Sequence, residues 1–456
     1  MLMRLMPFLL ILAVIVACAP RAPDAEASGD IDEVFHGVLQ IGPQSLRMEL
    51  ELQTGEEPRA ALISLDQSGV RIPMAEVDLS DDQMILAQPR LGVRYEGRRV
   101  DGRIVGVFSQ GGVNADLVFE PGRFETEASG DSSSAEEPDP LQTELTVEAG
   151  PVTLAGTLQR PEGEGPFPAM IILSGSGAQD RDGNIAGQPM LAALAQGLAD
   201  AGIASFRFDD RGVGGSSALT PAGPRDLAAD ATAILHAIGA REDVSCIGFA
   251  GHSEGGLIAL LAADEAQPGF ILTLAGMHLP MRETLYGQSR ALILASGGTP
   301  EQAAANRALQ DAVLDAIEAE GGGDASEAIE AALLAIGASA DLAAQQAQIW
   351  GQPYMYASLQ IDPSEAAAAY DGPLTAVFAQ NDLQVLPAEN AAELEQARAD
   401  LATEIITLEG VDHLFQFNAT GLPAQYGAAG HPMQPEALAR IGEAAQRLVQ
   451  SGCRID

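Results

Sequence analysis

The stretch GFAGHSEGGLIAL, residues 248–260, places Ser253 at the centre of a G-x-S-x-G motif. The apolar run VSCIGFA (244–250) is typical of a buried strand, and the run EGGLIALLAADEA (254–266) is typical of a helix. On such a sharp strand-to-helix turn a serine hydroxyl is exposed, and the glycines let neighbouring backbone approach closely. We therefore interpret Ser253 as a nucleophile; a structural serine in a glycine-rich turn is the alternative.

A nucleophilic serine needs a base, and the base needs a carboxylate that orients it. Asp382 follows the apolar run LTAVFAQ (374–380), and His413 follows the run EIITLEG (404–410). Because the carboxyl ends of parallel strands meet at one edge of a sheet, we expect both side chains at the same edge as Ser253. The sequence thus predicts Ser253, Asp382 and His413 as a catalytic triad, in the order Ser, Asp, His.

Other residues fit these roles less well. Asp412 is a rival acid, but it is adjacent to His413 and poorly placed to bond its ring, so we expect a solvated neighbour. His252, beside the nucleophile, is expected to pack inside the turn. The remaining histidines are His36 in the N-terminal part, His236 in a helical pattern, and His278 and His431 in loops without a preceding strand.

An acyl-transfer site also needs two convergent backbone N–H groups, which form an oxyanion hole. The residue after the nucleophile, Glu254, is expected to supply one of them. The second is expected from the loop LSGSGAQDRDGN (173–184), with Ser176 as the first choice and Gly177 as the second. The sequence alone does not decide between these two donors.

The pattern around these motifs divides the chain into parts. Residues 31–124 contain short alternating runs separated by Gly, Pro and Asp, which indicates an all-β domain. Residues 125–141 are an acidic, Ser-rich linker, and residues 142–456 alternate strands with helices, which predicts a parallel sheet covered on both faces. Residues 277–371 interrupt that sheet with an Ala-rich helical block, broken at residues 321–323 by three glycines. We expect this insertion to be a lid over the site; a remote packed bundle is the alternative.

The chain resembles the secreted bacterial α/β-hydrolase esterases that carry an N-terminal β domain. The matching stretches are LSGSGAQDRDGN, FDDRGVGGSS, the HSEGG elbow in GFAGHSEGG, LQIDPSEAAAAYDGPLTAVFAQNDLQV and GVDHLFQ, and less specifically ISLDQSG and GVFSQGG. The resemblance implies an α/β-hydrolase fold and a serine carboxylesterase that acts on a small-molecule ester through an acyl-enzyme, with Ser253, Asp382 and His413 as its triad. The longer Ala-rich insertion and the complete lack of Lys depart from the pattern.

Two other functions stay open. One is an aminopeptidase or an acyltransferase on the same fold, because a fold does not determine the bond that is cleaved. The other is an envelope-binding lipoprotein in which the β domain carries the main role.

The N-terminus indicates export to the cell envelope. Residues 1–18 contain Arg4 and an apolar run too short to span a bilayer, and they end in a lipobox-like Ile-Val-Ala-Cys with Cys18 last. We expect Cys18 to be acylated and to anchor the chain in a membrane through a tether, residues 19–30. An ordinary secretory signal with an incidental cysteine is the alternative.

Charge and cysteine content limit the partners and cofactors. The formal net charge of −40 repels nucleic acid and anionic lipid headgroups. The glycine-rich loop DDRGVGGS (209–216) lacks the lysine of a phosphate-binding loop, and neither a dinucleotide fingerprint nor metal-ligand spacing is found, so we expect no cofactor and no metal. Cys246 and Cys453 are far apart in the sequence, and we expect both to be free thiols.

Overall fold

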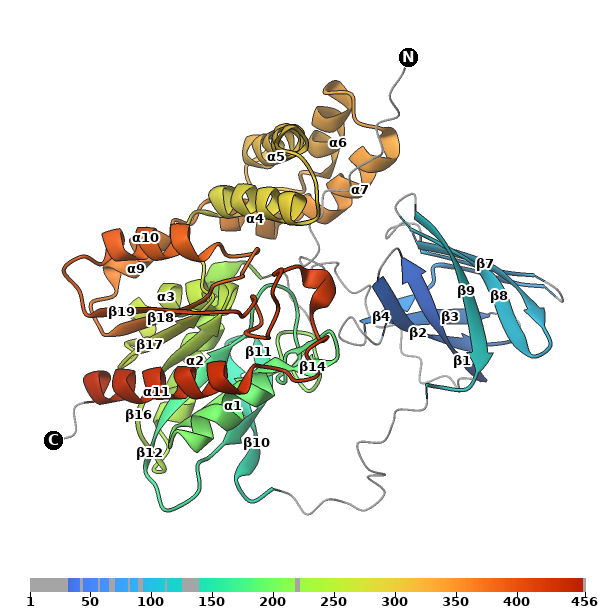
Figure 1. The fold of residues 1–456 in the computed structure, drawn as a ribbon. Helices are drawn as coiled ribbons and strands as arrows, with labels where there is room; N and C mark the ends of the chain where they lie inside the picture. The colour runs from blue at the N-terminus through green and yellow to red at the C-terminus, as the bar shows by residue number, and fades with distance from the viewer. Residues whose placement is uncertain are drawn as a thin grey trace.

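The computed structural model describes residues 32–41, 44–55, 58–64, 70–80, 83–88, 93–110, 113–124, 139–217 and 222–453 (Figure 1). The expected signal, Cys18 and the tether therefore lie outside the described residues, as does most of the expected linker. Among the described residues, no helix is both long and apolar enough to cross a membrane.

The N-terminal part is all-β, as expected, and forms one nine-stranded antiparallel sheet in the order β4-β3-β2-β1-β9-β8-β7-β6-β5. Alternate residues face a single core, which contains Leu50, Leu62, Leu86 and Phe119. The strands are β1 (Glu33–Ile41), β2 (Gln44–Gln53), β3 (Arg59–Ser64), β4 (Val70–Pro73), β5 (Glu76–Leu79), β6 (Met84–Gln88), β7 (Val93–Val100), β8 (Arg103–Gln110) and β9 (Val113–Pro121).

The C-terminal part is built on an eight-stranded sheet in the order β10-β11-β15-β12-β16-β17-β18-β19. The entry hairpin β10–β11 is antiparallel and pairs antiparallel with β15, while all later neighbours are parallel. The strands are β10 (Gln142–Ala149), β11 (Val152–Gln159), β12 (Phe167–Leu173), β15 (Ala204–Phe208), β16 (Val244–His252), β17 (Ile271–Leu274), β18 (Leu374–Ala379) and β19 (Thr403–Leu408); β13 (Asn184–Ile185) and β14 (Gln188–Pro189) form a separate small hairpin.

Helices cover both faces of this sheet because successive strand residues point to opposite sides. In β12, Met170 and Ile172 pack with helices α1 (Met190–Asp200) and α11 (Pro435–Gly452). The alternate residues Ile171 and Leu173 point to the opposite face of the sheet. There they pack with α2 (Pro224–Gly239), α3 (Glu254–Ala266) and α10 (Pro387–Ala397). The expected parallel sheet with helices on both faces is therefore confirmed.

The helical insertion enters after β17 and leaves before β18 (yellow to orange in Figure 1). Its helices are α4 (Met281–Ala295), α5 (Pro300–Glu320), α6 (Ser326–Ala335), α7 (Ala340–Trp350), α8 (Pro353–Leu359) and α9 (Pro363–Ala369). The expected break is confirmed: α5 ends at Gly321, whose φ of 74° is left-handed and suits glycine. Buried Val313 and Ile317 pack in one cluster with Leu257 of α3, so the insertion has a core that is continuous with the sheet region.

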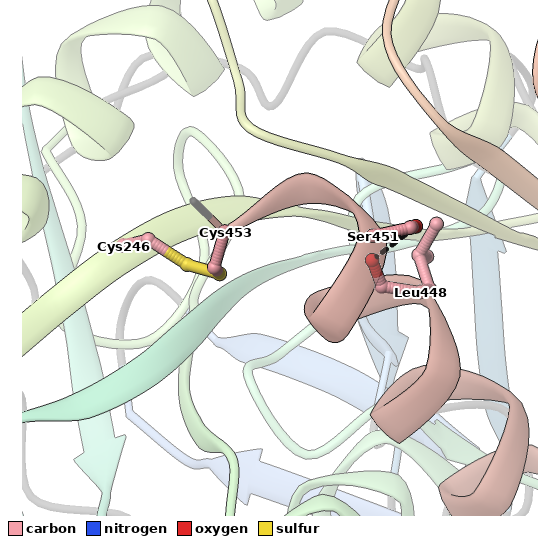
Figure 2. Close-up of a disulfide and its surroundings, with 4 residues drawn as sticks. All are labelled: Cys246, Leu448, Ser451 and Cys453. Carbon is pink, nitrogen blue, oxygen red and sulfur yellow. Dashed lines mark hydrogen bonds between the residues drawn. A yellow bond between two sulfur atoms is a disulfide. The ribbon is translucent and has the colours of Figure 1, made fainter. Parts of the chain in front are cut away.

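The prediction of two free cysteines is wrong, because Cys246 and Cys453 form a disulfide (Figure 2). Their Cα atoms are 5.9 Å apart although 207 residues separate them in the sequence. Cys246 lies near the start of β16, and the last helix α11 ends beside it, where a Cβ atom on Gly452 would lie 2.4 Å from the Gly269 carbonyl oxygen. This long-range approach leaves no local signal in the sequence.

Candidate active site

Ser253 lies on a strained turn between β16 and α3. Its φ of 53° and ψ of −119° are rare for a residue with a side chain, and such a backbone costs on the order of 1–3 kcal/mol. The turn is held by hydrogen bonds from the Ser253 N–H to the Leu274 carbonyl (2.9 Å) and from the Gly256 N–H to the Ser253 carbonyl (3.1 Å). The packing of β16 against β17 thus fixes the conformation of this serine.

The two glycines of the motif are required by backbone contacts. A Cβ atom on Gly251 would lie 2.2 Å from the carbonyl oxygen of Gly255. A Cβ atom on Gly255 would lie 2.4 Å from the carbonyl oxygen of Leu173 and 2.5 Å from that of Ser174. A side chain at Gly251 would therefore collide with the start of α3, and one at Gly255 with the end of β12, which is the physical basis of the G-x-S-x-G spacing.

Asp382 and His413 lie in the loops after β18 and β19, and their side chains form a hydrogen bond. The His413 Nδ1 atom is 2.7 Å from Asp382 Oδ2, and both residues are buried. The other carboxylate oxygen, Oδ1, accepts the backbone N–H groups of Gln384 (2.7 Å) and Val385 (3.0 Å). Because the Asp382 carboxylate can only accept a hydrogen bond, His413 Nδ1 carries the proton. The other ring nitrogen, Nε2, then has a lone pair that can accept a proton.

His252 packs inside the turn, as expected. Its Nε2 atom lies 2.9 Å from the backbone carbonyl oxygen of His413, and the two rings lie 4.8 Å apart. Burial, and then the electrostatic effect of the neighbouring His413, lower the pKa of His252 to about 3, so the His252 ring is neutral and donates from Nε2. In the part of the chain that the structure describes, no hydrogen bond joins the Ser253 hydroxyl to the His413 ring. The structure therefore pairs Asp382 with His413 directly and links them to the Ser253 turn through His252.

Asp412 differs from its expected role as a solvated neighbour. It is wholly buried and accepts hydrogen bonds from the Leu414 N–H (3.0 Å), the Gln416 N–H (3.1 Å) and the Asn418 side chain (3.0 Å). These bonds turn its carboxylate into the following loop instead of toward water. Asp412 thus shapes the segment that carries His413.

His278 was also misjudged as a loop residue without a preceding strand. It follows β17 by four positions and is completely buried, and its backbone N–H donates to the Asn390 side chain (2.8 Å). It belongs to the packing beneath α10.

The loop after β12 passes directly beside Ser253. A Cβ atom on Gly175 would lie 3.3 Å from both the Ser253 Cβ atom and His252 Nδ1. Ser176 and Gly177 follow, and within the described residues neither backbone N–H donates a hydrogen bond. Glu254 is the first residue of α3, where a backbone N–H has no intrahelical acceptor. Glu254 therefore directly follows Ser253, and the loop that carries Ser176 and Gly177 passes beside it at Gly175.

Sequence reasoning missed Asp210 and Tyr354, and it assigned no role to the side chain of Glu254. Asp210 follows β15 and accepts hydrogen bonds from the Ser174 hydroxyl (3.1 and 3.0 Å) and the Gln179 N–H (2.8 Å). The Glu254 carboxyl is buried and accepts a hydrogen bond from the Tyr354 hydroxyl of α8. The strand-end position that identified Asp382 could have identified Asp210 as well, whereas nothing in the sequence pairs Glu254 with Tyr354.

Comparison with known proteins supports the class that this topology defines. A family model described as serine aminopeptidase, S33, matches residues 188–307, which contain Ser253 but neither Asp382 nor His413. The sheet order, the strained serine turn and this match agree on an α/β-hydrolase fold.

The relatives span two activities. Esterase EstD from Thermotoga maritima is 23% identical over 280 residues, which are 61% of this chain and 62% of that esterase. Solved structures that match include Est1E from Butyrivibrio proteoclasticus with bound ferulic acid (14% identity, 67% of this chain and 99% of that chain, TM-score 0.43) and a proline iminopeptidase from Mycobacterium smegmatis (16% identity, 69% and 100%, TM-score 0.42).

Proposed function

We propose that this chain is a serine carboxylesterase that cleaves small carboxylic esters through an acyl-enzyme. The observation that carries the proposal is the 2.7 Å hydrogen bond between Asp382 and His413, in a loop that His252 ties to the strained Ser253 turn. An oriented histidine and a strained serine at one edge of a sheet are the parts that acyl transfer needs. The similarity to an esterase supports an ester as the substrate.

In the proposed mechanism, His413 Nε2 takes the proton of the Ser253 hydroxyl while Oγ attacks the ester carbonyl carbon. Asp382 holds the ring in the correct tautomer and stabilises the imidazolium that forms. The N–H of Glu254, together with that of Ser176 or Gly177, stabilises the oxyanion. His413 then returns the proton to the leaving alcohol. Water, activated in the same way, hydrolyses the acyl-enzyme and regenerates Ser253.

The second candidate is an aminopeptidase, favoured by the description of the matched family model. Both candidates use the same triad and differ only in the leaving group. The test compares kcat/KM for p-nitrophenyl acetate with kcat/KM for a panel of aminoacyl p-nitroanilides. Ser253→Ala should abolish turnover, while Ser245→Ala, at an exposed position on the same strand, should not. Faster cleavage of an anilide than of any ester would replace the esterase by a peptidase.

The helical insertion acts, in this proposal, as a lid whose apolar side chains line the acyl site. It is tethered between β17 and the strand that delivers Asp382, and it packs on Leu257 of α3. Leu285→Ala and Leu333→Ala, at buried insertion positions, should then change the preference among esters of increasing acyl length. An unchanged chain-length profile with only a loss of thermal stability would identify the insertion as scaffold.

The chain is further proposed to be an envelope lipoprotein, anchored in a membrane by acyl groups on Cys18. The support is the lipobox-like sequence alone. Mass spectrometry of the native protein should find acyl chains on an N-terminal Cys18, and the protein should partition into detergent. An unmodified Cys18 in the mature chain would exclude this anchor.

A further inference from the structure

A carboxyl group is buried directly beside the proposed nucleophile. Glu254 begins α3 and is only 3% exposed. Burial raises the pKa of its side chain, because removing a charge from water is unfavourable. A buried carboxyl is retained only where hydrogen bonds compensate for lost water. The partners of this carboxyl therefore indicate what it does.

Those partners come from two segments that are far apart in the sequence. The Tyr354 hydroxyl, on α8 of the insertion, donates to Glu254 Oε1. The Ser176 side chain, in the loop after β12, lies near enough to the same carboxyl to lower its pKa, against the larger effect of burial. The Glu254 carboxyl thus lies between the helical insertion and the loop that passes beside Ser253.

The same loop is held from another direction by Asp210. Its carboxylate accepts from the Ser174 hydroxyl and the Gln179 N–H, which lie on either side of Ser176. Burial, and then the charges of Glu254 and Asp209, raise the pKa of Asp210 to about 7. Asp210 thus binds the loop on both sides of Ser176, and the Glu254 carboxyl lies near the middle of the loop.

The middle of this loop matters because of its backbone. The N–H of Glu254 and the N–H of Ser176 are candidate donors to the oxyanion, and the Glu254 carboxyl lies near the Ser176 side chain. We propose that Glu254 is a positioning residue that couples the helical insertion to the oxyanion hole, through Tyr354 on one side and Ser176 on the other. The position of α8 then controls how well the two N–H groups converge. This proposal rests on the proposed esterase function.

The coupling predicts that its removal weakens stabilisation of the transition state and leaves substrate binding unchanged. Tyr354→Phe removes one hydroxyl and keeps the ring, so kcat should fall by about 10-fold or more while KM changes little, since small displacements of catalytic groups reduce rate strongly. The affinity for a trifluoromethyl ketone, which forms a tetrahedral adduct, should fall in parallel with kcat/KM. Tyr356→Phe, on the same helix, is the matched control and should behave like the parent.

A double substitution separates coupling from simple packing. Glu254→Met removes the carboxyl at similar length, and adding Tyr354→Phe to it should cause no further loss of kcat, because the hydroxyl acts through that carboxyl. Tyr354→Phe alone decides the matter if the Glu254 variant does not fold. A parent-like kcat in Tyr354→Phe, or independent losses in the double variant, would overturn the coupling and leave the esterase intact. A parent that neither cleaves any ester nor reacts with a fluorophosphonate would overturn the proposed function, and the coupling with it.

Discussion

The Nε2 atom of His252 lies 2.9 Å from the backbone carbonyl oxygen of His413, although 161 residues separate the two. The residue before the proposed nucleophile therefore holds the backbone of the proposed base. Because burial keeps His252 neutral, this hydrogen bond is retained well into the acid range. The relative position of Ser253 and His413 thus depends on a side chain that takes no part in proton transfer.

Replacing His252 should slow catalysis by displacing His413. His252→Phe keeps a ring but loses the donor, so kcat should fall by about 10- to 100-fold with little change in KM. His252→Gln retains an N–H that can reach the same carbonyl and should recover part of the loss. Steady-state kinetics on a short ester would measure both, and equal rates for the two variants would show that the hydrogen bond has no such role.

Asp382 and Asp412 should respond differently to the same substitution. Asp382→Asn should lower kcat by about 10⁴-fold, because the amide no longer stabilises the required tautomer of His413. Asp412→Asn should mainly reduce stability, by about 1–3 kcal/mol, since its three buried hydrogen bonds would be disturbed. The two variants are compared by their kcat per folded molecule and by their free energies of unfolding in urea. A larger loss of kcat in Asp412→Asn would mean that Asp412 is the orienting acid.

Asp210 should make stability depend on pH. Its pKa rises from 3.8 to about 7 on folding, so the folded state binds its proton more tightly than the unfolded state. The resulting stabilisation is complete below about pH 4 and is lost as the pH rises through about 7. Urea unfolding across this range should therefore show that Asp210→Asn reduces the decline in stability toward neutral pH, whereas Asp264→Asn, at an exposed position, does not. Parallel curves for the parent and Asp210→Asn would contradict the raised pKa.

The Cys246–Cys453 disulfide should stabilise the fold without affecting chemistry. It lies near the start of β16, whereas Ser253 follows the end of that strand. Cys453→Ser should lower the free energy of unfolding by about 2–4 kcal/mol and leave kcat close to the parent value. A reductant should destabilise the parent but not the variant. Two titratable thiols in the folded, unreduced parent would show that the bond does not form.

The sequence predicted what depends on local pattern. The elbow glycines, the helix 254–266 and the break at Gly321 were all correctly placed, because periodicity and backbone conformation leave local signals. Asp382 and His413 lie together after β18 and β19, where the two apolar strands predict them, and their catalytic roles stay predictions. The disulfide, the burial of Asp412 and the contact between Glu254 and Tyr354 depend instead on how distant segments pack, and no local pattern specifies that packing.

The most direct test of the central claim is to label the purified protein with a fluorophosphonate and identify the modified residue by peptide mass spectrometry. We predict stoichiometric modification of Ser253, lost in Ser253→Ala and strongly slowed in His413→Ala, with Ser245→Ala labelled as the parent is. Labelling that persists in Ser253→Ala, or an active esterase that takes up no label at Ser253, would contradict the account.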